Sequence, residues 1–191
     1  MGKAVILPYL LALSLGGCGN GQQLPPQTAA DIRPDDTSAV CGMFITGLPG
    51  PRGEAYIEGR TLPLKFGSTR DFFGYILEPE HQQILQHLFV QDSALIDWTH
   101  PSNSAATFID ARKAWYVAWQ PLPGDMGPTL ASFAKRANAE AFVKARGGEL
   151  LGFDEITPQL ILSLASTCPQ KGTLAFKLAR HCMKGNISNA R

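Results

Sequence analysis

The chain has 191 residues, with 17 Lys and Arg against 16 Asp and Glu, so its formal net charge is +1. This balance, without any run of basic residues, excludes the electrostatic surface on which nucleic-acid binding depends. The length suits one domain or two small ones. No apolar stretch reaches the ~18 residues that a membrane-spanning helix needs.

The N-terminus has the pattern of a secretory signal that ends in a cysteine. Lys3 precedes an apolar run that is too short to span a membrane, and Leu15-Gly16-Gly17-Cys18 resembles a lipobox. We therefore expect residues 1–17 to be removed and Cys18 to carry acyl chains, such as palmitate, which together anchor stably. The alternative is an ordinary signal peptide with a chance cysteine. Loss of Lys3 leaves 17 − 1 = 16 basic residues against 16 acidic ones, a formal charge of zero.

The residues after Cys18 predict where the protein sits. In bacterial lipoproteins, an Asp directly after the lipidated cysteine keeps the protein at the inner membrane. This chain has Gly19 at that position, so by this similarity we expect a periplasm-facing protein on the outer membrane. Residues 18–38 contain Gly, Gln, Pro, Asp and Ser, with little that could form a core. They predict a flexible, lipidated tether that spans at most ~65 Å.

The first folded unit is predicted over residues 39–112. It begins with AVCGMFI, a β-branched and apolar run that is typical of a strand. Ser68 is a suitable N-cap for a helix. The remaining expected elements are strands at 54–58 and 62–66, helices at 71–77 and 80–90, and extended segments at 94–98 and 106–111.

The second unit is predicted over residues 113–165, and the tail over residues 166–191. Asn138 is expected to cap a helix that Gly147-Gly148 ends. The expected elements are strands at 114–119, 129–134 and 150–153, and helices at 139–146 and 157–165. The order resembles that of the first unit, which predicts an α+β fold of two similar β-β-α-β units in one body. Independent occurrence of two common patterns is the alternative.

The other cysteines suggest one disulfide and one free thiol. Cys168 and Cys182 are close together in the sequence, and a bridge between them would contribute about 3 kcal/mol in an oxidising compartment. Cys41 then remains a thiol. It is either a buried, small apolar residue or a functional group.

Cys41 and Met43 suggest a site for a soft metal ion. In a strand, residues two apart point to the same face, with Cα atoms roughly 6.5 Å apart. A thiolate with a thioether favours Cu(I) over Zn(II), Ca(II) or Mg(II). Paired CxxC, HExxH, Walker and GxSxG motifs are all missing from the sequence.

A third sulfur donor is expected from Met126. It lies in GDMGP, where flanking glycines leave the side chain free of packing duties. The alternative is that Met126 fills a gap in the core. Three soft donors on a strand and a loop would bind Cu(I) and still allow a partner to displace one, as a carrier requires.

Motifs that occur in one order resemble a known family. AVCGM, AWYV, GDMGP and FAKRANAEAFVKARGGELLGFDEI, between about Val40 and Ile156, resemble the nitrous-oxide reductase accessory lipoprotein (NosL) family. The resemblance implies one Cu(I) per chain, held by Cys41, Met43 and Met126, with a fourth nitrogen or oxygen ligand that we do not assign. It also implies two β-β-α-β units similar to part of organomercurial lyases.

The same resemblance implies a role for the protein. Family members supply copper for the copper–sulfide cluster of nitrous-oxide reductase in denitrification, alongside a membrane ABC-type maturation complex. We therefore expect a metallochaperone and not an enzyme. The alternatives are a thiol-dependent enzyme with Cys41 as nucleophile, for which the sequence offers no nearby resolving thiol, and a structural lipoprotein with Cys41 inert.

Other residues receive ordinary roles. The tail departs from the family pattern, because it carries Cys168 and His181-Cys182-Met183, either a disulfide with its neighbours or an accessory soft-metal site. Asp154-Glu155 is expected in a solvated loop. Three histidines whose spacing does not suit metal binding are expected at the surface: His81, His87 and His100. Two tryptophans are expected in the core: Trp115 and Trp119.

Overall fold

The computed structural model describes residues 1–2 and 27–164 of the chain. The expected signal peptide, the lipidation site Cys18, the cysteines Cys168 and Cys182, and His181-Cys182-Met183 lie outside the described residues and stay predictions. None of the helices in the described part is long and apolar enough to cross a bilayer.

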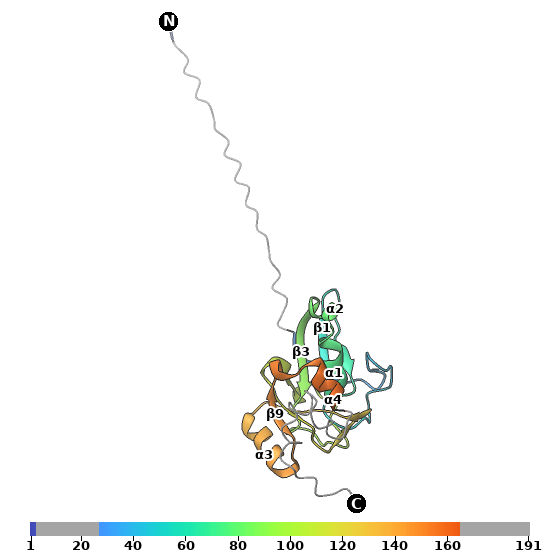
Figure 1. Ribbon diagram of the computed structural model, residues 1–191. Helices are drawn as coiled ribbons and strands as arrows, with labels where there is room; N and C mark the ends of the chain where they lie inside the picture. The colour runs from blue at the N-terminus through green and yellow to red at the C-terminus, as the bar shows by residue number, and fades with distance from the viewer. Residues whose placement is uncertain (3–26, 165–191) are drawn as a thin grey trace, which may run out of the picture.

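The first half of the fold is an antiparallel sheet with helices on the connection between its strands (Figure 1). Strand β1 pairs on one side with β2, Gly53 opposite Phe66, and on the other with β3, Gly53 opposite Val90. The strand order is β2-β1-β3-β4. The elements are β1 (Gly53–Ile57), β2 (Leu64–Phe66), α1 (Thr69–Ile76), α2 (Pro79–Gln82), β3 (Leu85–Gln91) and β4 (Phe108–Asp110), with a 3-10 turn at Ala105–Thr107.

The second half repeats this arrangement on a smaller scale. Strand β5 lies between β8 and β9 in a sheet of order β8-β5-β9, as β1 lies between β2 and β3. In both halves the helix follows the second strand, so the α+β fold of two similar β-β-α-β units is confirmed. The elements are β5 (Trp115–Ala118), β6 (Pro123–Gly124), β7 (Gly127–Pro128), β8 (Ala131–Phe133), α3 (Arg136–Arg146), β9 (Glu149–Gly152) and α4 (Pro158–Ser163), with 3-10 turns at Ala111–Lys113 and Phe153–Glu155.

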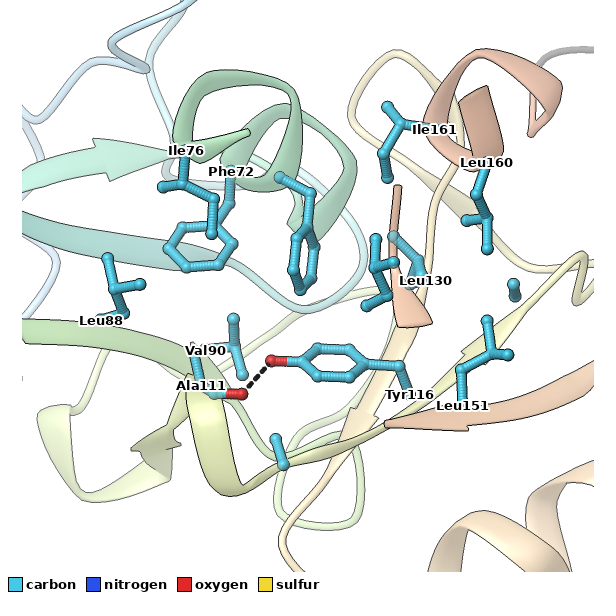
Figure 2. Packing of buried hydrophobic residues seen from close by; sticks show 14 of the residues in the cluster. Phe72, Ile76, Leu88, Val90, Ala111, Tyr116, Leu130, Leu151, Leu160 and Ile161 are labelled. Carbon is cyan, nitrogen blue, oxygen red and sulfur yellow. Dashed lines mark hydrogen bonds between the residues drawn. The ribbon is translucent and has the colours of Figure 1, made fainter. Parts of the chain in front are cut away.

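One hydrophobic core joins the two halves (Figure 2). Phe73 of α1 packs edge-on against Tyr116 of β5, with ring centroids 5.0 Å apart. The Tyr116 hydroxyl donates to the Ala111 carbonyl at 2.6 Å. Helix α4 packs beside α1. The two halves therefore do not form separate domains. Their shared core holds the loops of one half in a fixed place relative to the loops of the other half.

Several helix ends follow from capping. Ser68 accepts a hydrogen bond from the Asp71 amide at 3.2 Å, as expected for the start of α1. Gly147, at φ +83°, ends α3. The expected cap at Asn138 is wrong, because α3 begins at Arg136 with Lys135 as its N-cap residue.

Two local predictions in the first half are also wrong. The helix expected at 80–90 is limited to α2, and the rest is strand β3, because its backbone pairs with β1 on one side and β4 on the other. The segment at 94–98 is a turn, in which the Asp92 carboxylate accepts from the Ala94 amide at 2.9 Å. Trp115 and Trp119 are half-buried and pack at the edge of the core.

Candidate metal centre

Cys41 lies in a tight loop, not in a strand. Gly42 takes a left-handed conformation with φ +71°, and its amide donates to the Ser38 carbonyl at 2.8 Å. The Ser38 amide donates to the Met43 carbonyl at 2.8 Å, and an isolated bridge joins Thr37 to Phe44. The expected strand at 39–45 is therefore wrong, and so is the argument that strand alternation puts Cys41 and Met43 on one face. We call residues 38–43 the cysteine loop.

The cysteine loop is fastened to the edge of the first sheet. The Ala39 amide donates to the Lys65 carbonyl of β2 at 2.8 Å, and the Ile45 amide donates to the Asp36 carbonyl at 3.0 Å. The Lys65 ammonium pairs with the Asp36 carboxylate. Partial burial opposes ionisation of Asp36, but hydrogen bonds from Lys65 and the Arg33 amide lower its pKa below the usual value. The loop is thus held at both ends.

Met126 lies at the tip of a second loop, the β6–β7 hairpin. Gly124 pairs with Gly127, so Asp125 and Met126 form a two-residue turn. Gly127 has φ +110°, which side-chain-bearing residues rarely adopt. A Cβ at Gly124 would lie only 2.9 Å from that of Thr129. The flanking glycines thus allow the turn to form and to pack closely, and we call residues 123–128 the methionine hairpin.

The methionine hairpin is attached to the start of α1. Thr69 donates through its hydroxyl to the Leu130 carbonyl at 2.6 Å, and the Arg70 amide donates to the Thr129 hydroxyl at 3.2 Å. The Arg70 guanidinium reaches the Met126 carbonyl at 3.5 Å. Asp71 is the next residue in this first turn of the helix. These bonds bring Asp71 next to the hairpin.

The cysteine loop, the methionine hairpin and the start of α1 converge. The Cys41 Sγ, one carboxylate oxygen of Asp71 and one of Asp125 all lie within 4.8 Å of one another. All three residues are half-buried. A Cβ at Gly67 would collide with the Asp125 carboxylate, so glycine at this point between β2 and α1 leaves room for that carboxylate. This arrangement is a candidate metal centre of one thiol and two carboxylates.

The Asp125 carboxylate lies close enough to Asp71 to affect its ionisation. Burial and the neighbouring negative charge of Asp125 raise the pKa of Asp71 to about 6. The Oδ2 atoms of Asp71 and Asp125 are both buried without a hydrogen-bond partner in the described part of the protein. Buried acceptors without donors are rare, and a bound cation would satisfy them.

The predicted sulfur donors lie in the same two loops. Met43 is two residues from Cys41 and is 43% exposed, and Met126 follows Asp125 directly and is 55% exposed. Neither methionine fills a gap in the core, which was the alternative for Met126. Their role as ligands stays a prediction. Cys41 is a free thiol among the described residues.

Sequence reasoning missed Asp71 and Asp125 as candidate ligands. Asp125 stands inside GDMGP, where its position next to Met126 was the available signal. Asp71 had only the signal of an acidic first turn, which is common at helix N-termini. The histidines in the described part contact their neighbours in the fold. For example, the His81 ring stacks on the Tyr75 ring with the ring centroids 3.8 Å apart.

Comparison with known proteins assigns the chain to a family. The family model described as NosL matches residues 29–161. The chain belongs to the NosL family. It is 39% identical over 170 residues to a protein of Stutzerimonas stutzeri named "Copper-binding lipoprotein NosL", covering 87% of this chain and 86% of the relative. A protein of the same name from Achromobacter cycloclastes is 33% identical over 170 residues, covering 86% of this chain and 85% of the relative.

A solved structure agrees with the family assignment. The crystal structure of the copper chaperone NosL from Shewanella denitrificans superposes with a TM-score of 0.66 at 41% identity, covering 70% of this chain and 98% of that one. These relatives are named for copper binding and chaperone activity, not for catalysis. The resemblance to the family and the expectation that the chain is not an enzyme are therefore confirmed.

Proposed function

We propose that the protein is a lipid-anchored copper chaperone that carries Cu(I) on Cys41, Met43 and Met126. The single observation that carries the proposal is the meeting of the cysteine loop with the hairpin turn that bears Met126, with the Cys41 Sγ within 4.8 Å of an Asp125 oxygen. A thiolate and two thioethers are soft donors, which select Cu(I). Copper is the cargo of such a protein and has to leave again.

The surroundings of the site suit a transferable ion. Both methionines are exposed, so a donor from a partner can approach the metal and replace a thioether. The carboxylates of Asp71 and Asp125 add negative charge beside the cation, and one of them is the best candidate for the unassigned fourth ligand. A half-buried thiolate with exposed thioethers supports binding and release together.

The destination of the copper is part of the same proposal. The protein delivers Cu(I) for assembly of the copper–sulfide cluster of nitrous-oxide reductase in denitrification, together with an ABC-type maturation complex. Acylation of Cys18 would hold it on the periplasmic side of a membrane, and Gly19 favours the outer one. Support comes from the family assignment and from the lipoprotein names of two relatives.

An anaerobic Cu(I) titration in competition with a colorimetric chelator tests the copper site. We expect one Cu(I) per chain, a loss of at least 100-fold in affinity for Cys41→Ser, and roughly tenfold losses for Met43→Leu and Met126→Leu, about 1.4 kcal/mol each. Val40→Ala is the control, because Val40 is an exposed apolar neighbour of Cys41 without a donor atom. Unchanged binding by Cys41→Ser would contradict the proposal.

Delivery needs its own experiment. Copper-loaded protein is mixed with the maturation complex and copper-free reductase, and formation of the cluster is followed by its visible absorption. We expect cluster formation from the loaded parent protein and none from Cys41→Ser. Equal cluster formation from both would contradict the role in delivery, even if copper binding holds.

A further inference from the structure

One buried side chain ties together the segment that carries the methionine hairpin. Gln120 is the residue before this segment and is 5% exposed. Its Nε2 donates to the carbonyls of Leu122, at 2.7 Å, and Thr129, at 2.9 Å. Its Oε1 accepts from the Leu122 amide at 2.7 Å. A single carboxamide therefore bridges the two limbs of the chain from Leu122 to Thr129.

The backbone before Gln120 is strained. Trp119 has φ +54°, and no other non-glycine residue in the described part of the chain has a positive φ. A bulky residue in this conformation is unfavourable and persists only where the surrounding structure enforces it, often at functional sites. The segment just before β9 leaves room for the chain here, because a Cβ at Gly148 would lie 2.7 Å from the Ala118 carbonyl oxygen. The strained turn brings the Gln120 side chain between the limbs.

A second support holds the hairpin from outside. The Trp98 indole donates to the Pro123 carbonyl at 2.7 Å and stacks on Phe142. A Cβ at Gly50 would lie 3.4 Å from the Gly124 Cα. The base of the hairpin is thus fixed on two sides, and its tip holds an Asp125 carboxylate oxygen within 4.8 Å of the Cys41 Sγ, with the exposed Met126 next in the chain.

We propose that Gln120 is a positioning residue of the copper site, which sets the place of Met126 relative to Cys41. This inference rests on the proposed function. Gln120 holds no metal itself. It lowers the conformational freedom of the hairpin before copper binds, so less binding free energy is spent on ordering Met126. Two hydrogen bonds from the carboxamide to opposite limbs make Gln120 better suited to this role than a residue that holds one limb.

The test is a thermodynamic cycle on Cu(I) affinity. Gln120→Met has nearly the same shape and no carboxamide, and we expect it to bind Cu(I) about tenfold more weakly. In the Met126→Leu background the same substitution is expected to change affinity by less than twofold, because its effect passes through Met126. X-ray absorption of a copper-loaded Gln120→Glu variant, which adds no sulfur atom, should show fewer sulfur ligands than the parent.

A matched control separates positioning from stability. Gln91 is also buried, and its Nε2 donates hydrogen bonds to the Ser102 carbonyl at 2.7 Å and the Thr107 hydroxyl at 2.9 Å. Gln91→Met should lower the thermal midpoint at least as much as Gln120→Met and leave copper affinity within twofold of the parent. If Gln120→Met does not fold, Gln120→Glu replaces it throughout. That variant would keep the oxygen that accepts from the Leu122 amide and would lack both hydrogen-bond donors.

The outcomes distinguish the two proposals. Unchanged affinity in Gln120→Met, or an equal loss in both backgrounds, overturns the positioning role while the copper site stands. An equal loss in Gln91→Met also overturns it. If Met126→Leu binds copper as the parent does, the ligand set of the proposed function is wrong, and the positioning role falls with it.

Discussion

The Sγ atom of Cys41 lies within 4.8 Å of a carboxylate oxygen of Asp125, although the two residues belong to loops in different halves of the fold. The halves are hydrogen-bonded to each other, since the Ser132 hydroxyl of β8 donates to the Gln91 carbonyl of β3 at 2.6 Å. Neither half contains the complete site. Assembly of the candidate metal centre therefore depends on the packing between the two β-β-α-β units.

The charge of Asp125 is expected to strengthen copper binding. Asp125→Asn keeps an oxygen for the Met126 amide, which now donates to Oδ1 at 2.8 Å, and removes only the charge. Opposite charges near a protein surface attract by several kcal/mol at ~4 Å, part of which solvent screens. We expect about tenfold weaker Cu(I) binding in a chelator competition, and no change for Asp154→Asn on an exposed turn. Equal affinity in both variants contradicts this role.

Gly42 is expected to be needed for its backbone conformation and not for space. Its φ is +71°, and a Cβ would meet no atom within 4 Å. Gly42→Ala should cost about 1 kcal/mol of unfolding free energy, because an L-residue is strained there. Gly42→Asn should cost less, because Asn tolerates the left-handed region better. Urea unfolding of both variants checks this order. The reverse order would show that the cost of substituting Gly42 does not come from its φ angle.

The same order is expected for copper affinity. If the left-handed turn sets the direction of Cys41 and Met43, Gly42→Ala should weaken Cu(I) binding several-fold and Gly42→Asn should retain more of it. A variant that loses stability with unchanged affinity would mean that the loop keeps its shape when copper binds.

Some features could be predicted because local chemistry decides them. The Ser68 cap, the Gly147 stop and the apolar run of β5 each depend on residues close in sequence. The glycines around Met126 likewise predict an exposed turn, which the structure contains. The motif order was enough to suggest the family.

Other features depend on contacts between distant residues. Apolar composition made 39–45 resemble a strand, but no neighbouring strand pairs along it in the described structure, and Gly42 turns the chain instead. Strand β3 resembled a helix until its pairing with β1 and β4 was known. Asp71 and Asp125 meet only after both halves pack, so neither sequence neighbourhood reveals them as a pair.

Two glycines are expected to respond to alanine in opposite directions. Gly74 lies in α1 with no atom within 4 Å of an added Cβ, so Gly74→Ala should raise the free energy of unfolding by about 0.5–1 kcal/mol. Gly53 lies in β1, where a Cβ would lie 2.6 Å from the Phe72 side chain. Gly53→Ala should cost about 2 kcal/mol through overpacking. Urea denaturation measures both, and stabilisation by Gly53→Ala would contradict this packing.

Glu54 is expected to make the fold less stable as pH rises. It is fully buried in β1, accepts from the Ala30 amide at 2.9 Å, and has a second oxygen, Oε1, that finds no hydrogen-bond partner among the described residues. Burial raises its pKa from 4.5 to about 7. The folded state therefore keeps a proton that the unfolded state releases, so the contribution of Glu54 to stability is fully present below about pH 4.5 and is lost as pH rises through 7.

Glu54→Gln isolates this effect, because the amide stays neutral and its oxygen can still accept from Ala30. We expect the variant to gain about 3 kcal/mol relative to the parent between pH 4.5 and pH 8, from a shift of this size at 1.36 kcal/mol per pKa unit. Urea unfolding at several pH values measures the difference. Glu140→Gln is the control, since Glu140 is exposed and pairs with Arg136 in the preceding turn of α3, so its difference from the parent should change by less than 0.5 kcal/mol, the usual range for a surface substitution. A constant difference between Glu54→Gln and the parent would mean that Glu54 is ionised in the folded protein throughout this range.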